Sequence, residues 1–470
     1  MVISRRRFVS GLAAAASAPF VRLGAGLPQG PRFTGGLRHG LPVPAIGWRG
    51  QSAASLGLQQ GTLAVKDRLR PGDAAASGQA IPRLPATVGA DLRRTFRDLR
   101  RHFVFEYYPW YGTSPWRHWD QWQRVPPYDI AATSMPRLGP YDSRDAAVIA
   151  QHARWMAEAG VGAINVSWWG RDTWEDRLVP RIMDVMRDHD IAVTFHLEPY
   201  TNDRAATYAD DVLYLLREYG ERRRWDAFLL LEDASGTPAP VFKSFRTIVP
   251  PMGQDCHGVT YPVPDYVPDG TWRRTTDGLR STLRADFERL TLLADVTDIG
   301  RMRAAGFDGM AIYDNFIRPP AWHALARDCS ARDLLFSFNV NAGFDGIALR
   351  TVEPDSCYVP TPIEPAGEYD WDAAEAREAA ARRSEARLLE SFNTTLRLQT
   401  DRSLSNARRG FFLVFINSFN EWHEGTQFEP AKDAADLSPE ERRADYRNPA
   451  NGSYRLQNLR ERLRPILTAR

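Results

Sequence analysis

The sequence lacks the features that mark several common protein classes. Only three of its 470 residues are cysteines, Cys256, Cys329 and Cys357, and they lie too far apart to form a zinc or redox motif. At most one disulfide bond is possible, and we expect none. The formal net charge is only +2, and no basic stripe accompanies a nucleic-acid-binding motif. The sequence therefore predicts no nucleic-acid partner.

Signature motifs of several enzyme classes are missing as well. The chain has no His-Glu-x-x-His element of zinc hydrolases and no Gly-x-Ser-x-Gly nucleophile elbow. The first strand-like run leads into "PWYGTSPWRHWDQW" and not into a glycine-rich phosphate turn. A metal site built from His196, Glu198, His423 and a further glutamate remains an alternative, but its parts lie on different predicted strands. We expect no metal and no cofactor.

The N-terminus has no apolar run long enough to span a bilayer. The run in residues 8–21 is short and follows a twin arginine in "SRRRF". This start resembles a twin-arginine export signal, and "ASA" at residues 16–18 fits a cleavage site, although a proline follows it. We expect residues 1–22 to be a signal peptide, and the mature protein to be periplasmic or secreted without a stable membrane span. An uncleaved anchor or an arbitrary basic start is the alternative.

Beyond a Gly-, Pro- and Ala-rich stretch, the chain alternates regularly between strand-like and helix-like patterns. Residues 23–95 have the composition of a linker or loosely packed extension. The predicted strands are Phe103–Trp110, Ala163–Trp168, Ala192–Glu198, Pro240–Phe245, Arg289–Ala294, Gly309–Asp314, Leu334–Val340 and Phe411–Asn417. Amphipathic helical patterns between them are typical of βα units. We predict an α/β fold in which residues 96–470 form a single (β/α)8 TIM barrel; a doubly wound open sheet is the alternative.

Two long insertions and many aromatic residues accompany this pattern. The segments Arg246–Thr276 and Asp345–Glu368 are long enough to be lids or disordered loops. In a barrel both follow strands at the C-terminal face, where they can wall a cleft. Aromatics make up 11% of the chain, with 14 tryptophans. We expect most of them, including Trp110 and Trp119, in the core, and others to stack on sugar rings.

Polar and aromatic side chains follow six of the predicted strands. In such barrels the active site lies at the C-terminal strand ends. These ends carry "EYYPWYG" (106–112), "SWWG" (167–170), "HLEPY" (196–200), "YDN" (313–315), "NVN" (339–341) and "SFNEWHEGTQFEP" (418–430). Each alone is compatible with a structural role, but their coincidence favours a site. Glycoside hydrolysis needs one carboxylic acid for the leaving oxygen and a second carboxylate, and Glu421 and Glu424 are the candidates.

These motifs, with "HWD", "LGPYDSRD" and "GFDG" between them, resemble glycoside hydrolase family 99, the endo-α-mannosidase and endo-α-mannanase family. The resemblance runs from about Phe103 to the C-terminus, and "NEWHEGTQ" is its most specific part. It implies a (β/α)8 barrel and an oligo- or polysaccharide substrate of the α-mannan kind. It also implies that Glu421 is a base acting on the 2-hydroxyl of the sugar, which attacks C1 to form a 1,2-anhydro intermediate. Glu424 is then the acid/base and needs a raised pKa.

The resemblance also implies substrate-binding roles by position. Tyr108, His196, Glu198, Tyr200 and Asn420 match positions that line the reacting sugar. Trp168 and Trp169 match a pair whose second member faces the adjoining subsite, and Tyr313 is a further candidate substrate-binding residue. The "YDNF" stretch, the two asparagines of "NVN" and the first insertion look unlike the family pattern. The glycan therefore stays open, with a different α-linked polysaccharide or a non-catalytic carbohydrate-binding barrel as alternatives.

Overall fold

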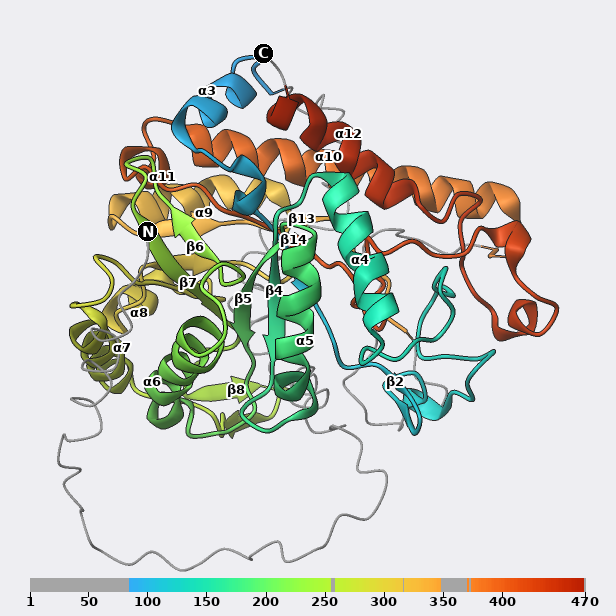
Figure 1. Ribbon diagram of the computed structural model, residues 1–470, viewed down its shortest axis with the longest axis horizontal. Helices are drawn as coiled ribbons and strands as arrows, with labels where there is room; N and C mark the ends of the chain where they lie inside the picture. Colours follow the sequence, from blue (N-terminus) through green and yellow to red (C-terminus); the bar gives the residue numbers. More distant parts are fainter. Residues whose placement is uncertain (1–83, 255–257, 316, 348–369, 372, 469–470) are drawn as a thin grey trace, which may run out of the picture.

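The computed structural model describes residues 84–254, 258–315, 317–347, 370–371 and 373–468 (Figure 1). A curled ten-stranded sheet forms its centre, and the strands of its main path follow the order β12-β11-β10-β7-β5-β4-β1-β14-β13. The predicted signal peptide, the linker up to residue 83, Cys256, Cys357 and most of the second insertion lie outside the described residues. Cys329 is buried and forms no disulfide.

Each predicted strand is present, usually shortened at one or both ends. The parallel strands are β1 (Phe103–Tyr107), β4 (Ala163–Trp168), β5 (Ala192–Leu197), β7 (Pro238–Ser244), β10 (Thr291–Ala294), β11 (Gly309–Ala311), β12 (Leu335–Ser337), β13 (Val340–Asn341) and β14 (Val414–Asn417). The seventh predicted strand is interrupted: β12 pairs with β11, whereas β13 pairs with β14. This interrupted strand joins the two ends of the sheet, so the fold is the predicted single (β/α)8 barrel.

Helices follow the strands and form an outer layer. They are α4 (Ala146–Ala159), α5 (Trp174–Asp188), α6 (Arg204–Leu215), α7 (Asp269–Leu283), α8 (Ile299–Ala304), α9 (Pro319–Ala331), α10 (Ala374–Thr400), α11 (Ser405–Arg408) and α12 (Tyr454–Thr468). A π-helix, Leu216–Glu221, extends α6. Residues 88–95, at the end of the predicted linker, form the helix α3 (Val88–Thr95), which packs on α12 (Figure 1). The ordered fold therefore begins a few residues earlier than the composition indicates.

The connections between these strands and helices contain shorter elements. They are the antiparallel strand β6 (Leu230–Glu232), the hairpins β2 (Gly112–Thr113)–β3 (Trp116–Arg117) and β8 (Met252–Gln254)–β9 (Thr260–Pro262), and the 3-10 helices Leu99–His102, Gln121–Gln123, Ala434–Asp436 and Glu441–Ala444. The hairpin β8–β9 and the start of α7 lie within the first insertion, which is therefore partly regular. Among the described residues, no helix is both long and apolar enough to cross a membrane.

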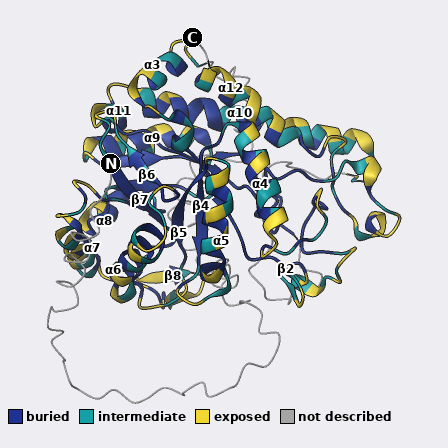
Figure 2. Cartoon of the chain, in the orientation of Figure 1, coloured by how far each residue is buried: buried dark blue, intermediate teal, exposed yellow. Residues whose placement is uncertain are grey.

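The central strands are buried, whereas the helices expose residues on their outer sides (Figure 2). Two separate apolar clusters occupy the strand–helix layer and the barrel interior. Along β1, Phe103 and Phe105 pack outward with helix residues, whereas Val104 belongs to a cluster of inward-facing strand residues. Since side chains alternate along a strand, Glu106 also points inward, one layer nearer the C-terminal mouth. Asn165 and Lys243 share this polar layer and are buried with it. A polar floor thus lies directly below the face where barrels carry their active sites.

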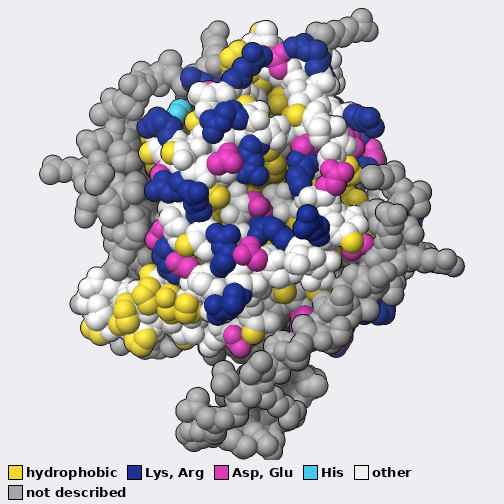
Figure 3. Space-filling view, turned by 90° about the vertical axis from the view of Figure 1, so that its left-hand side faces the viewer, with side chains coloured by type: hydrophobic (Ala, Val, Ile, Leu, Met, Phe, Trp, Pro, Cys, Tyr) yellow, Lys and Arg dark blue, Asp and Glu magenta, His cyan; other side chains and the backbone are white. Residues whose placement is uncertain are grey.

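On the side shown in Figure 3, the outer surface has no large patch of charges of one sign. Lysine and arginine side chains are interspersed there with aspartate and glutamate. This mixture agrees with the small formal net charge of +2.

Candidate active site

The two predicted catalytic glutamates lie on the loop that follows β14. This loop starts at a cis peptide bond between Asn417 and Ser418. The backbone N–H of Glu421 donates to Ser418 Oγ at 2.8 Å, and the carboxylate of Glu421 accepts from the backbone N–H of His423 at 3.0 Å. Glu424 Oε2 accepts from the hydroxyl of Tyr313 at 2.8 Å. Each carboxyl group therefore accepts a defined hydrogen bond, Glu421 from the loop itself and Glu424 from Tyr313, which follows β11.

Burial places a proton on this pair near neutral pH. Removal from water raises the pKa of Glu424 to about 7, against the opposing effect of the Tyr313 hydroxyl. Burial and the charge of Glu424 raise the pKa of Glu421 well above its usual range. Two close buried carboxyls repel each other when both are ionised, so one of them keeps its proton. The raised pKa predicted for Glu424 is confirmed.

Further predicted residues converge on the same place. The pKa of the Tyr108 hydroxyl is raised well above its usual value by burial, and then by the negative charges of Glu106, Glu198, Glu421 and Glu424 around it. Glu198 accepts from Ser167 Oγ at 2.8 Å, and burial raises its pKa. Tyr108, Glu198 and Tyr313 therefore lie with the two catalytic candidates in one buried, strongly acidic cluster.

His196 and Trp169 complete the walls of this cluster. His196 is only 1% exposed, its Nδ1 lies 3.3 Å from Glu106 Oε2, and its Nε2 has no hydrogen-bond partner among the described residues. The half-buried Trp169 donates its indole N–H to Ser167 Oγ at 3.0 Å, and its ring centroid lies 6.4 Å from that of Trp110. A buried ring nitrogen without a partner, such as this Nε2, is suited to a hydrogen bond with a ligand hydroxyl.

Three predicted substrate-binding residues, Trp168, Tyr200 and Asn420, do not present a free group to this cluster. Trp168 is fully buried in the strand–helix layer, where its indole N–H donates to Asp176 of α5 at 2.7 Å. Alternation along β4 explains this position, because Ser167 and Trp168 point to opposite faces. Tyr200 is 38% exposed at the rim and donates its hydroxyl to Asp211.

Asn420 connects the end of β1 to the loop after β14 that carries Glu421 and Glu424, which we call the catalytic loop. Its Oδ1 accepts from the backbone N–H of Tyr108 at 2.8 Å, and its Nδ2 donates to the Tyr108 carbonyl at 2.9 Å and to the Tyr141 hydroxyl at 3.1 Å. These contacts occupy the whole amide, so Asn420 holds Tyr108 in place. Trp119, expected in the core, is fully buried and stacks on Tyr111.

The sequence reasoning missed the charged residues of the polar floor. Lys243 Nζ lies 2.6 Å from Glu106 Oε1, and Asn165 Nδ2 donates to Glu106 Oε2 at 2.8 Å. Asp295, just after β10, accepts from the backbone N–H of Tyr313, and burial raises its pKa to about 6. In the sequence, the sign that Glu106 and Lys243 have a special role was a single charge inside an otherwise apolar strand pattern, "VFEYY" and "VFKSF".

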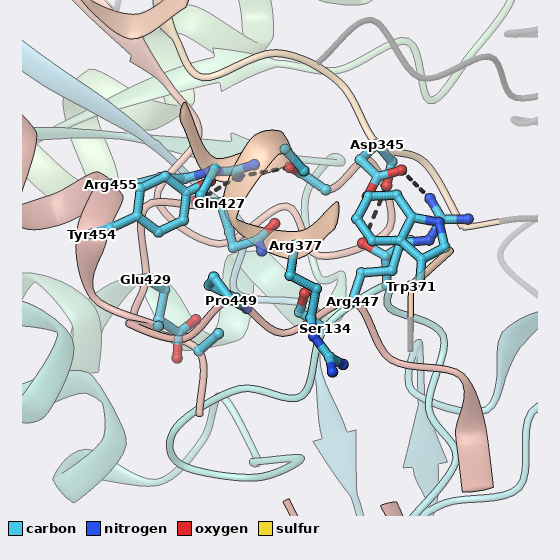
Figure 4. A pocket seen from close by; sticks show the side chains of 16 residues that line it. Ser134, Asp345, Trp371, Arg377, Gln427, Glu429, Arg447, Pro449, Tyr454 and Arg455 are labelled. Atoms are coloured by element: carbon cyan, nitrogen blue, oxygen red, sulfur yellow. Dashed lines mark hydrogen bonds and ion pairs between the residues drawn. The ribbon is translucent and has the colours of Figure 1, made fainter. Parts of the chain in front are cut away.

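Behind the catalytic loop lies a hollow of about 540 Å³, including space open to solvent, between α10, α12 and the loop (Figure 4). Arg455 of α12 donates to the carbonyls of Gly425 and Gln427 at 2.7 and 3.0 Å. Arg447 pairs with Asp345 in the same hollow. Gly425 has φ +63°, and a Cβ on it would lie 2.2 Å from the Asp345 carbonyl oxygen. The loop is thus clamped from its far side, and only glycine fits at 425.

The described residues contain no group of three or more His, Cys, Asp or Glu side chains arranged to hold a metal ion. His423, one of the alternative ligands, places its Nε2 3.0 Å from the His118 carbonyl. Burial lowers the pKa of His423 to about 3, so this ring is neutral and its Nε2–H donates to that carbonyl.

Comparisons with known proteins match one glycosyl hydrolase family model and several endo-alpha-mannosidases. Residues 99–229 match the family model described as Glycosyl hydrolase family 99. The glycoprotein endo-alpha-1,2-mannosidase of Mus musculus is 28% identical over 394 residues, covering 76% of this chain and 74% of that protein. The glycoprotein endo-alpha-1,2-mannosidase-like protein of Homo sapiens is 29% identical over 358 residues, covering 69% and 67%. The structure of the GH99 endo-alpha-mannosidase from Bacteroides thetaiotaomicron superimposes with a TM-score of 0.51 at 20% identity, covering 78% of this chain and 99% of that one, and shares its fold.

Proposed function

From the premise that the chain belongs to glycoside hydrolase family 99, and is a glycoside hydrolase, we propose that it is an exported, retaining, endo-acting enzyme that cleaves α-mannosidic linkages in a mannose-containing glycan. The observation that carries this proposal is the buried pair Glu421 and Glu424 after the last barrel strand, whose pKa values are both raised by burial. The named activity of the curated relatives supports the α-mannoside part.

The first step that we propose uses the 2-hydroxyl of the sugar as the nucleophile. In an α-mannoside O1 and O2 are axial on opposite faces of the ring, so O2 is aligned behind C1 for displacement. Glu421 takes the proton of O2, the new O2–C1 bond forms, and the C1–O bond to the leaving group breaks. Glu424 gives its proton to the departing oxygen.

The second step reverses these proton movements. Glu424, now ionised, takes a proton from a water molecule that attacks C1, and the O2–C1 bond breaks. O2 recovers its proton from Glu421, which returns the pair to its starting state. Two inversions at C1 give net retention. The raised pKa of Glu424 supports its role as the acid. The backbone N–H of His423 stabilises the ionised form of Glu421, against the burial and the charge of Glu424 that raise the pKa of this residue.

The test is a mannan-fragment digest by wild type, Glu421→Gln and Glu424→Gln, with Glu158→Gln as the control on the exposed side of α4. We expect both active-site variants to lose at least about a hundredfold in kcat, because each removes one obligatory proton transfer. The control keeps its activity. NMR of the first-formed sugar is expected to show the α anomer; a β product contradicts the proposed mechanism.

A further inference from the structure

The hollow behind the catalytic loop has no role in the proposed mechanism (Figure 4). Its walls come from α10, from the start of α12 and from the loop, which contributes Gly425, Gln427, Glu429 and Ala431. Its volume of about 540 Å³, with the part open to solvent, falls within the roughly 300–1,000 Å³ of small-molecule pockets. The hollow is therefore large enough to hold a small ligand.

One polar atom of this hollow lacks the partner that burial normally requires. Gln427 is only 7% exposed, and its Oε1 has no hydrogen-bond partner among the described residues. The nearby guanidinium of Arg455 donates to the backbone carbonyl of Gln427 at 3.0 Å and not to this side-chain oxygen. Buried polar atoms are almost always hydrogen-bonded, and an amide oxygen only accepts. Gln427 Oε1 therefore marks a place for an N–H or O–H donor of a ligand.

The charged groups around this amide are largely engaged by other residues. Arg447 pairs with Asp345, and its guanidinium carbon lies 4.8 Å from the ring centroid of Trp371. Arg455 donates to two loop carbonyls and, through its Nε, to the Tyr454 hydroxyl at 3.0 Å.

The charge of the whole lining is nearly balanced. Besides Arg447, Arg455 and Asp345, its charged members are Arg377 and Glu429. Three arginines thus face two acids, and an anion that entered the hollow would meet both carboxyl groups as well as the guanidinium groups. A neutral ligand avoids this repulsion.

Apolar and aromatic side chains form further parts of the wall, among them Ala380, Ala381 and Pro449. In the view of Figure 4, the rings of Tyr454 and Trp371 lie on either side of Gln427. Apolar and aromatic side chains can pack on the C–H faces of a pyranose ring, and a sugar hydroxyl can both donate and accept. An inorganic anion offers chiefly acceptors, which an amide oxygen cannot use. The chemistry of the hollow therefore suits a neutral sugar.

We propose that this hollow is a second carbohydrate-binding site, in which one sugar unit donates a hydroxyl hydrogen to Gln427 Oε1. The site is separate from the proposed catalytic one, because neither Glu421 nor Glu424 lines the hollow. The identity of the sugar as mannose rests on the proposed function. The place of the site rests only on the geometry of the free protein.

Methyl NMR of wild-type protein with 13C-labelled alanine methyl groups reads the hollow directly. The reporters are Ala380 of α10 and Ala431 of the catalytic loop, which both line the hollow, and their signals are assigned from Ala380→Gly and Ala431→Gly. Free mannose is the probe, because it has no glycosidic bond and is not consumed. We expect both signals to shift until they saturate, and inorganic phosphate at the same concentration to leave them unchanged.

Two variants separate this site from the catalytic one. Ala381→Trp places a large ring in the hollow, so we expect the mannose-dependent shift of the Ala380 methyl to disappear. Ala386→Trp, on the exposed side of the same helix, is the matched control and keeps the shift. Gln427→Leu removes the acceptor at similar volume, and we expect it to weaken the apparent affinity by about tenfold or more. If Ala381→Trp fails to fold, Gln427→Leu still carries the test.

Silent reporters in wild type overturn the inference, and so does a shift that Ala381→Trp or Gln427→Leu retains at wild-type affinity. A shift caused by phosphate and not by mannose overturns it as well, since the hollow is then an anion site. If the wild type leaves α-mannosides intact while mannose still shifts the reporters, the proposed activity fails and the second site stands. An active enzyme with silent reporters has the opposite meaning.

Discussion

The pKa of Glu424 depends in part on the hydroxyl group of Tyr313. Tyr313 donates to Glu424 Oε2 at 2.8 Å, and this hydrogen bond stabilises the ionised form against the effect of burial. Burial raises the pKa of Glu424, the Tyr313 hydroxyl lowers it, and the charges of Asp314 and Glu198 raise it further, with a result of about 7. An acid with this pKa is half protonated in neutral solution, which suits proton donation and its reversal in one cycle.

Tyr313→Phe is expected to make Glu424 a weaker acid. Loss of a hydrogen bond to a carboxylate removes about 1.5 kcal/mol from the ionised form, which raises the pKa by about one unit. Because the reaction needs protonated Glu424, activity is lost as pH rises through this pKa, and the alkaline limb of the kcat profile moves to higher pH. A pH–rate profile measures the shift. An alkaline limb at the wild-type position would assign the titration to another group.

At the scale of elements, the catalytic loop depends on a helix beside it in space. α12 begins some thirty residues after Glu424, yet its Arg455 holds the carbonyls of Gly425 and Gln427. Hydrogen bonds from a charged donor contribute about 1.5–3 kcal/mol each, which is enough to fix a loop conformation. The helix that closes the barrel ring thus also orients the carboxyl groups.

Arg455→Ala is expected to lower kcat by about tenfold or more, since small misplacements of catalytic groups are costly. KM changes less, because His196 of β5 and Trp169, which directly follows β4, are positioned by strands and not by this loop. Arg464→Ala, on the exposed side of the same helix, is the control. Steady-state kinetics and thermal unfolding of both variants check the result. A variant that loses stability but keeps its kcat would restrict Arg455 to a structural role.

At the scale of the whole molecule, the proposed export depends on residues 4–8. The twin-arginine route is the export route that this N-terminal motif addresses. We expect the double variant Arg5→Lys, Arg6→Lys to remain as an unprocessed precursor inside the cell. Fractionation and mass spectrometry of the mature N-terminus measure this. Full processing of the variant would contradict twin-arginine export.

The sequence alone determined the barrel and pointed to the proposed catalytic pair. Strand-length apolar runs at regular spacing, as in Ala163–Trp168, depend on local periodicity, and local periodicity survives in any context. Glu421 and Glu424 were found because they follow such a run within a specific motif. The same reasoning placed Tyr108, His196 and Glu198 at strand ends, where parallel strands bring them together.

Only the tertiary structure decided which side chains face the site and what charge they carry. Trp168 and Trp169 are neighbours in sequence, but the pleat sends one into the strand–helix layer and leaves the other at the site. Lys243 and Glu106 are 137 residues apart in the sequence, where each appears as an isolated charge. They become neighbours only in the closed barrel. The physical reason is that burial and pairing are properties of the closed barrel. A carboxyl group acquires a pKa of about 7, and a buried lysine meets its carboxylate, only when strands distant in sequence surround them.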